Sequence, residues 1–485
     1  MASTDAVRTR TGVYHDSVSL MRVSRAASAL PGVEVAVVAM ATELNLGIAA
    51  ELGFGLPQAG PADLLIALRG EADALEAASA ELDGLLAALS APSAGGGGGG
   101  AERPPRTVRA AARERAATLA LVSVPGPHAF AEALDAVEAG LSVMIFSDNV
   151  PVEQEVLLKR RAAERGVLVM GPDCGTAVVG GAGLGFANVL RPGPVGLVAA
   201  SGTGAQQVTC LLDLAGVGVS HVLGVGGRDL SADVGGLSTL RALEALDADP
   251  ATELIVLISK PPAPEVARAV EAAVAKLGTP VVTALLGPGQ EDLTSVTEAA
   301  LRALGVPVPA WPSWPAPGTP SETTDVSPGT SDTKAGEAGE TGRNVRGIYS
   351  GGTLCVEARL IAGTGEFTDF GDDAYTVGRA HPMIDPTLRL EALAEVPPGD
   401  VVLLDVVLGH GADPDPSARL APAIAGAVAR GVTAVVALVG SEGDPQGLTA
   451  QAGALNAAGA AVFTSNAGAA GYAARVAAGT AANAR

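Results

Sequence analysis

The sequence predicts a multidomain α/β protein whose last two domains share one design. Residues 193–207 read as an apolar strand, the turn Ser201-Gly202-Thr203-Gly204 and the start of a helix. Residues 345–356 repeat this order around Ser350-Gly351-Gly352-Thr353. Two copies of one α/β unit in a chain usually pack together, because each leaves an apolar face to bury.

Preceding the repeats, residues 107–188 alternate short apolar strands with helical segments, which predicts a Rossmann-like domain with a parallel sheet. The Gly-x-Gly-x-x-Gly fingerprint is missing after its first strand, so we do not expect a standard NAD site. Residues 8–91 alternate strands and helices on the smaller scale of a ferredoxin-like α+β domain.

Two stretches of biased composition separate these parts. Six consecutive glycines from Gly95 to Gly100 indicate a flexible linker, and Pro, Ser, Thr and Gly dominate residues 309–343, which we interpret as a disordered linker. A chain of 485 residues is also too long for one core. The predicted division is 1–91 ferredoxin-like, 92–106 Gly-rich linker, 107–190 Rossmann-like, 191–308 first repeat, 309–343 linker and 344–485 second repeat.

Composition restricts the partners. The formal net charge of −21 argues against nucleic acid and anionic membranes, whose phosphates would be repelled. Cys174, Cys210 and Cys355 show no CxxC spacing, so we expect a reducing cytoplasm and no metal site. The sequence also lacks an apolar run of about eighteen residues that would predict a membrane span.

The two glycine turns carry the first site prediction. Backbone N–H groups at a helix N-terminus lack intrahelical partners and share roughly half a positive charge, which favours a phosphate or carboxylate. One such turn alone is equally consistent with a strand-to-helix connection that binds nothing. The repetition of the turn favours the anion site.

Polar residues at other predicted strand ends extend this site, each with a simpler alternative. The polar residues within and after the strand 401–407 could simply cap a loop. The polar residues in 378–386 could lie in a loop whose shape is set by its prolines. Cys174 is a candidate because it follows a predicted strand, where it could face a bound ligand, and the alternative is a buried structural thiol. These further candidates are Cys174, Gly227, Arg228, His381, Asp385, Arg389, Asp405, Gly409, His410 and Gly411.

Several motifs in order carry a family resemblance. Gly171-Pro172-Asp173-Cys174, residues 191–196, Ser201-Gly202-Thr203 and residues 224–229 resemble the α subunit of succinyl-CoA synthetase. The second repeat resembles the flavodoxin-like ligase domain of that enzyme's β subunit. With residues 13–24, 378–386 and 403–416, the whole chain most closely resembles the FdrA family of acyl-CoA synthetase-like proteins.

The resemblance implies two flavodoxin-like domains that each aim a helix N-terminus at one phosphorylated histidine. The first is Gly202-Thr203-Gly204, and the second is either Gly351-Gly352-Thr353 or Gly409-His410-Gly411, between which the sequence does not choose. The loop that would bear the histidine corresponds to residues 287–292, which contain none. The glutamate that partners this histidine corresponds to Lys260, a cation that we expect to hold phosphate.

The FdrA resemblance further implies a subunit of an oxamate carbamoyltransferase-type enzyme of purine (allantoin) nitrogen catabolism. It would exchange a carbamoyl group between carbamoyl phosphate and oxamate or oxalurate without a phosphohistidine. One alternative is a CoA-dependent acid–thiol ligase, with CoA as the candidate cofactor, and another is a non-catalytic scaffold or metabolite-binding regulator. We expect additional subunits, an oligomer, and catalytic roles for Lys260, His381, Asp385 and His410.

Overall fold

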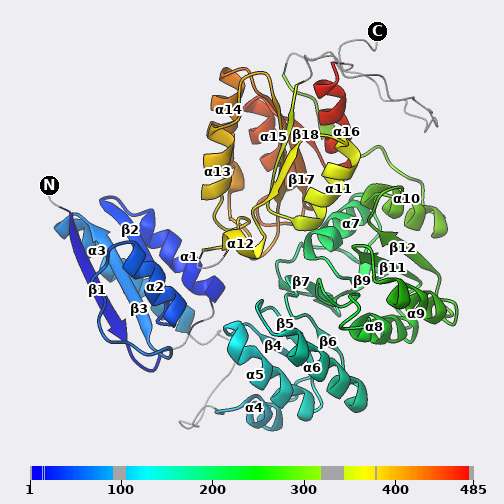
Figure 1. Ribbon diagram of the computed structural model, residues 1–485, viewed down its shortest axis with the longest axis horizontal. Helices are drawn as coiled ribbons and strands as arrows, with labels where there is room; N and C mark the ends of the chain where they lie inside the picture. The colour runs from blue at the N-terminus through cyan, green and yellow to red at the C-terminus, as the bar shows by residue number, and fades with distance from the viewer. Residues whose placement is uncertain are drawn as a thin grey trace. The chain divides into compact units, whose positions relative to one another are not determined.

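The computed structural model describes residues 3–13, 15, 17–90, 105–317, 343–376 and 379–479, which form two compact units (Figure 1). One unit comprises Met1–Glu114 with Thr376–Ala380, and the other comprises Arg115–Tyr375 with His381–Arg485. Most of the two predicted linkers lies outside the described residues. No helix within the described ranges has the length and apolar character needed to cross a bilayer.

The N-terminal unit contains an antiparallel sheet with β3 between β1 and β2. Because β3 is antiparallel to both, β1 and β2 are parallel, as in the split βαβ unit of ferredoxin-like folds. Leu64, Ile66 and Leu68 of β3 are buried against Leu75 and Leu82 of α3. The predicted α+β class is thereby confirmed. Its elements are β1 (Thr4–Arg10), α1 (Ser17–Ser28), β2 (Val33–Met40), α2 (Glu43–Glu51), β3 (Leu64–Gly70), α3 (Ala72–Ser90) and α4 (Val108–Glu114).

The second unit starts with the Rossmann-like part, a parallel sheet in the order β4-β5-β6. Its first helix begins at Gly126, where a Cβ atom would lie 2.3 Å from the carbonyl oxygen of Asp148, so only glycine fits this turn. The elements are β4 (Leu119–Val122), α5 (Gly126–Glu138), β5 (Ser142–Ile145), α6 (Val152–Arg165) and β6 (Val169–Met170).

The first repeat forms a sheet in the order β12-β11-β9-β10-β7-β8. Its parallel strands β10-β9-β11-β12 follow the flavodoxin-like order 2-1-3-4, with the topological switch point between β9 and β11. Residues 176–185, which the sequence assigned to the Rossmann-like domain, instead form the hairpin β7–β8 on this sheet. The elements are β7 (Thr176–Val179), β8 (Ala182–Gly185), β9 (Pro192–Ala199), α7 (Gly202–Leu214), β10 (Val219–Gly224), α8 (Leu237–Asp247), β11 (Leu254–Ser259), α9 (Pro264–Val274), β12 (Val281–Leu285) and α10 (Leu293–Ala303).

The second repeat forms a sheet in the order β13-β18-β17-β16-β14-β15, parallel except for the edge strand β13. The central strand β16 is buried along its whole length, in keeping with a sequence that is apolar except for Asp405. The elements are β13 (Ser313–Trp314), β14 (Val345–Tyr349), α11 (Gly352–Ala362), β15 (Glu366–Asp369), α12 (Asp373–Thr376), α13 (Thr387–Ala394), β16 (Val401–Val407), α14 (Pro416–Ala429), β17 (Thr433–Val439), α15 (Leu448–Ala457), β18 (Ala461–Phe463) and α16 (Asn466–Ala477).

The two repeats pack against each other through α7, α10, α11 and α16, which lie between the two sheets (Figure 1). Gln207, the sixth residue of α7, accepts a hydrogen bond from the backbone N of Asn466 (2.9 Å) and donates to the carbonyl of Thr464 (3.0 Å). Glu357, the sixth residue of α11, accepts from the backbone N of Leu293 (2.6 Å). Each side chain thus caps a helix of the other repeat, which makes the contact pseudo-symmetric.

Glu357 makes this contact sensitive to pH. Burial raises the pKa of its carboxyl from 4.5 to about 7. The folded protein therefore binds this proton more tightly than the unfolded chain does. The contribution of the proton to the unfolding free energy is complete below pH 4.5 and is lost as the pH rises through 7. We expect raising the pH from 4.5 to 8 to cost about 3 kcal/mol of unfolding free energy through this group.

The measurement is urea unfolding followed by tryptophan fluorescence. Both tryptophans report on the second unit, since Trp311 donates to Glu298 of α10 and Trp314 lies in β13. The control is Glu357→Gln, which cannot ionise. An identical pH dependence in the two proteins would contradict the assignment.

A buried ion cluster fastens the Rossmann-like part to the first repeat. The Nζ atom of Lys159 on α6 lies 2.7 Å from a carboxylate oxygen of Glu155 and 2.7 Å from one of Asp229, and donates to the carbonyl of Val225 at 3.0 Å. Asp229 also accepts from the backbone N of Ser238 and Thr239 at the start of α8. The loop 224–229 is therefore held from both sides.

Candidate functional site

The two glycine turns meet, as the paired repeats predict. Ser201 caps α7 and accepts a hydrogen bond from the backbone N of Gly204 (3.0 Å). A Cβ atom on Gly351 would lie 2.7 Å from the side chain of Thr203, and one on Gly204 would lie 3.2 Å from Cγ2 of Thr353. Between the two alternatives for the second turn, the structure therefore favours the start of α11.

The protein's own carboxylates occupy the second turn. Asp405 accepts from the backbone N of Ser350 (2.7 Å) and from its hydroxyl (3.0 Å), and also bonds the backbone N of Gly351. A Cβ atom on Gly352 would lie 2.5 Å from an oxygen of Asp369, so that carboxylate sits beside the first residue of α11. These internal carboxylates already place negative charge at this turn and oppose a second anion, so the predicted binding of a substrate anion by Ser350 to Thr353 has no geometric support.

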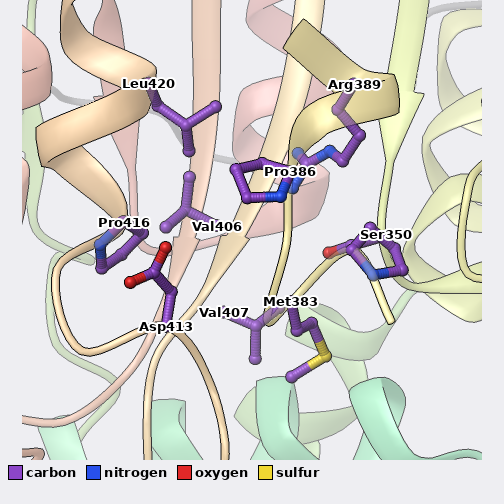
Figure 2. A pocket seen from close by; sticks show the side chains of 10 residues that line it. Ser350, Met383, Pro386, Arg389, Val406, Val407, Asp413, Pro416 and Leu420 are labelled. Atoms are coloured by element: carbon purple, nitrogen blue, oxygen red, sulfur yellow. The ribbon is translucent and has the colours of Figure 1, made fainter. Parts of the chain in front are cut away.

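Arg389 and Asp405 also differ from their predicted substrate-binding roles. Both are buried, the two side chains lie 3.0 Å apart, and Arg389 donates to the carbonyls of Ile348 and Asp405. The pocket beside them in Figure 2 has a volume of about 10 Å³, room for about one water molecule. Arg389 and Asp405 therefore position the Ser350 turn. The pocket is lined by Ser350, Pro382, Met383, Pro386, Arg389, Val406, Val407, Asp413, Pro416 and Leu420.

Asp385 is predicted to be catalytic, but in the structure its carboxylate is occupied by hydrogen bonds to neighbouring residues. It accepts from the backbone N and the hydroxyl of Thr387 at the start of α13, and from Arg419 at 2.6 Å. These bonds to Thr387 and Arg419 hold the pKa of its carboxyl below the usual value against the opposing effect of burial. A carboxylate held ionised in this way is a poor proton acceptor.

The turn Gly409-His410-Gly411 is not a helix start. The backbone of His410 pairs with Ala187, its N–H donating to the Ala187 carbonyl at 2.8 Å. Gly409 and Gly411 have φ of 113° and 87°, and side chains there would collide with Ala187 and Phe186. The glycines therefore allow close backbone packing, and the predicted phosphate contact at Gly409 and Gly411 and catalytic role of His410 have no geometric support.

His381 is a neutral histidine inside the second unit. Burial, followed by the charge of Arg389, lowers its pKa to about 4. Its Nδ1 atom accepts from the backbone N of Met383 (3.3 Å), which leaves the hydrogen on Nε2. The ring lies 5.4 Å from that of Phe186, and Nε2 approaches Gly371 so closely that a Cβ there would lie 2.9 Å away. At neutral pH this imidazole can donate a hydrogen bond and carries no charge.

The accessible part of the site lies at the carboxyl ends of β9 and β11, where open α/β sheets have their ligand crevice. Lys260 follows β11 and is exposed, and Gly227 and Arg228 are exposed on the loop after β10. Arg228 donates to the carbonyl of Val150 (2.7 Å) and pairs with Glu155 at 3.0 Å. Ligands of open α/β sheets bind at such a switch point.

Two aspartates that the sequence did not single out as site residues face this crevice. The pKa of Asp173 is raised to about 6, first by desolvation and then by the charges of Asp148 and Asp373, although the residue as a whole remains exposed. Desolvation also raises the pKa of Asp369 to about 6. The charge of Lys260 opposes both shifts. The sequence signal that could have identified them is their position at or just after a strand, Asp173 in GPDC and Asp369 in FTDFGDD.

The loop at residues 287–292 precedes α10 and contains no histidine. Its last residue, Asp292, caps α10 by accepting from the backbone N of Ser295 at 2.8 Å. A phosphohistidine on this loop is therefore excluded by the residues present.

Cys174 does not face the crevice. It is buried, its thiol donates to the carbonyl of Thr176 (3.5 Å), and desolvation raises its pKa to about 12. We expect about 1,000-fold less thiolate at pH 8 than for an ordinary thiol, so iodoacetamide should label Cys174 slowly in the folded protein. Mass spectrometry with and without urea measures this. Rapid complete labelling without urea would contradict the assignment.

Three family models match the chain. They are "AllF, heavy metal-associated domain" over residues 2–104, "CoA binding domain" over 191–285 and "CoA-ligase" over 348–476. The α/β class, with an N-terminal heavy-metal-associated-like domain followed by CoA-binding and CoA-ligase domains, is thereby shown. The CoA-binding model falls on the first repeat, whereas the sequence placed a CoA-binding-type domain at 107–190.

Three curated proteins and one solved structure are similar to this chain. The uncharacterized protein YahF of Escherichia coli is 38% identical over 495 residues, covering 93% of this chain and 95% of YahF. A succinate–CoA ligase α subunit of Archaeoglobus fulgidus is 31% identical over 158 residues, covering 32% of this chain and 54% of that subunit. A malate–CoA ligase α subunit of Methylorubrum extorquens is 28% identical over 169 residues, covering 33% of this chain and 56% of that subunit. An apo dinucleotide-forming acetyl-coenzyme A synthetase of Ca. Korarchaeum cryptofilum aligns over 78% of this chain and 87% of its own, with 18% identity and a TM-score of 0.31.

Proposed function

The chain belongs to the FdrA-like family of Escherichia coli YahF, and from this premise we propose that it is an acyl-CoA synthetase-like enzyme acting on an acyl phosphate. The observation that carries the proposal is the exposed Lys260 at the switch point where Ser201 to Gly204 begin α7. A helix N-terminus and an exposed ammonium suit the phosphate of an activated acid. An acidic chain needs such a local site to hold an anion.

The proposal gives these residues distinct roles. In the reaction, an acceptor forms a bond to the acyl carbon, the bond from that carbon to the phosphate oxygen breaks, phosphate leaves with the electron pair, and the departing phosphate takes the proton that the acceptor loses. Lys260 and the N–H groups of Gly202 and Thr203 stabilise the charge on the leaving phosphate. Arg228, exposed at the same crevice, would hold a phosphate group of CoA, and CoA would supply the accepting thiol.

Carbamoyl transfer between carbamoyl phosphate and oxamate or oxalurate is the second candidate. It is favoured by the histidine-free loop at 287–292 together with Lys260, because carbamoyl phosphate arrives activated and needs no phosphate relay. The match of residues 2–104 to a domain model named for AllF, combined with the FdrA resemblance, adds support. The proposal includes further subunits that complete the enzyme. A scaffold or regulator remains the third candidate, and an anion site without turnover would support it.

The test is a thermal-shift and turnover panel with acetyl phosphate, carbamoyl phosphate, oxamate and CoA. A ligand that binds the folded state raises the unfolding temperature. We expect an acyl phosphate to do so, and Lys260→Met to weaken its binding about tenfold or more, since a charge-assisted hydrogen bond contributes about 1.5–3 kcal/mol. The matched control is Lys276→Met, which removes another exposed lysine of the same repeat.

Each outcome separates the candidates. Turnover that requires CoA supports the ligase-like reaction, and phosphate-dependent cleavage of oxalurate without CoA supports carbamoyl transfer. Equal affinity in wild type and Lys260→Met would contradict the proposed site.

A further inference from the structure

The N-terminal domain matches a heavy metal-associated model, but its residues do not fit a heavy metal. Such metals are held by thiolate or imidazole ligands. The first 104 residues contain no cysteine, and His15 is their single histidine. Within the described ranges, no group of three or more His, Cys, Asp or Glu side chains could hold a metal ion. The second repeat, in contrast, presents polar atoms that can take part in a reaction.

Asp369 and His381 lie beside each other at the edge of the second repeat where α11 begins. Asp369 ends β15 and pairs with Tyr349, the residue before the Ser350 turn. A Cβ atom on Gly371 would lie 3.1 Å from Oδ1 of Asp369 and 2.9 Å from Nε2 of His381. The two side chains therefore border the same space beside Gly371.

Each of these side chains has one polar atom to which no described residue is hydrogen-bonded. Oδ1 of Asp369 accepts from the backbone N of Gly371 (2.9 Å), which leaves Oδ2 as an acceptor. Nδ1 of His381 accepts from the backbone N of Met383 (3.3 Å), which leaves Nε2–H as a donor. Both side chains are partly exposed, and neither Oδ2 nor Nε2 is among the enclosed atoms that lack a partner. A bound molecule can therefore reach both atoms.

This space adjoins the proposed phosphate site. A Cβ atom on Gly352 would lie 2.5 Å from Oδ2 of Asp369, and one on the preceding Gly351 would lie 2.7 Å from the side chain of Thr203 at the start of α7. The positive charge of Lys260 also acts on Asp369. A phosphate held by Thr203 and Lys260 would thus leave the acyl part of the molecule beside Asp369.

The surroundings give the two groups different protonation behaviour. Burial lowers the pKa of His381 to about 4, so its imidazole donates a hydrogen bond without carrying charge at neutral pH. Desolvation raises the pKa of Asp369 to about 6, so its carboxylate can take up and release a proton near neutral pH. The titratable groups that face Asp369 are Lys260, Cys355, Asp372, His381, Arg389 and Asp405.

We propose that Asp369 moves the proton of the acyl transfer while His381 holds the acyl oxygen, an inference that rests on the proposed function. As the acceptor bonds to the acyl carbon, its proton passes to Oδ2 of Asp369, which then gives it to the departing phosphate. Nε2–H of His381 donates to the acyl oxygen as negative charge develops there. These roles are the same for a thiol acceptor and for an amide nitrogen.

The first test is calorimetric titration of the full chain with acetyl phosphate, which needs no turnover. Asp369→Asn removes a negative charge beside the anion at about pH 8, so we expect it to bind acetyl phosphate about threefold or more tightly than wild type. At about pH 5 most of Asp369 is protonated, and the two proteins should bind equally. The matched control is Asp372→Asn, an exposed aspartate of the same loop, which should bind like wild type at both pH values.

The second test is the pH dependence of turnover. Asp369→Asn should lower kcat by about 100-fold or more and abolish the fall in rate below about pH 6. His381→Phe, which keeps an aromatic ring beside Phe186, should lower kcat by about 100-fold or more while the fall below pH 6 persists. Circular dichroism of each variant establishes that it is folded.

The outcomes separate this inference from the proposed function. If wild type does not bind acetyl phosphate, the proposed function fails and this inference fails with it. If wild type binds and Lys260→Met weakens binding, the inference alone is overturned when Asp369→Asn matches wild type in affinity at both pH values or keeps its rate and pH profile. An unchanged kcat in His381→Phe would overturn the role of His381.

Discussion

Replacing Lys159 by methionine is expected to lower the unfolding free energy by about 3–5 kcal/mol. The ammonium group is buried and compensates Glu155 and Asp229, which are equally buried. Without it, two carboxylates remain close together in a low-dielectric environment, with Arg228 reaching only Glu155. Removing one partner of a buried ion cluster costs much more than an exposed ion pair contributes.

The matched control is Arg161→Met on the same helix. Arg161 pairs with Glu164 at 3.0 Å, but both side chains are at least half exposed, so the expected change is about 0–1 kcal/mol. Urea unfolding followed by circular dichroism compares the two variants. A cost below about 1 kcal/mol for Lys159→Met would contradict the buried cluster.

The second large effect is expected for Asp405→Ala, again about 3–5 kcal/mol. This change leaves the buried guanidinium of Arg389 without its carboxylate and removes the acceptor of the Ser350 backbone N and hydroxyl. The N-terminus of α11 would also lose an internal anion. Asp405→Asn, which keeps one acceptor oxygen, is expected to cost less.

Asp385→Ala is the matched control for this change. Asp385 also pairs with an arginine of the same repeat, Arg419, but these side chains are 40% and 34% exposed. The screened pair contributes little, so we expect a loss of about 1 kcal/mol or less from the ion pair. Urea unfolding followed by tryptophan fluorescence measures the unfolding free energies of Asp405→Ala and Asp385→Ala. Equal losses in the two variants would contradict the structural role of Asp405.

Much of the architecture was predictable because its signals are local. The apolar run, glycine turn and helix start around Ser201 lie within fifteen residues, and the same sequence order recurs around Ser350. Local signals also placed the parallel sheets, because strands alternating with helices permit few arrangements. Residues 176–185 were included in the Rossmann-like domain, whereas they form a hairpin on the sheet of the first repeat, because pairing of β7 with β10 joins segments about forty residues apart.

The site was predictable only in part. Lys260 and Arg228 lie exposed at the crevice, where the strand order alone places ligands. Arg389, Asp385 and Cys174 have the right chemistry, but burial or internal partners commit them to structure. A sequence names a side chain, whereas its partners come from distant segments.

The sequence by itself determined two strand–turn–helix repeats, their parallel sheets and the loss of a histidine carrier from residues 287–292. Only the tertiary structure decided that the turn at Ser201 lies beside the exposed end of β11, whereas the carboxylates of Asp405 and Asp369 lie at the turn at Ser350. The physical reason is that a helix N-terminus attracts any anion, and the nearest carboxylate is set by which strands lie side by side.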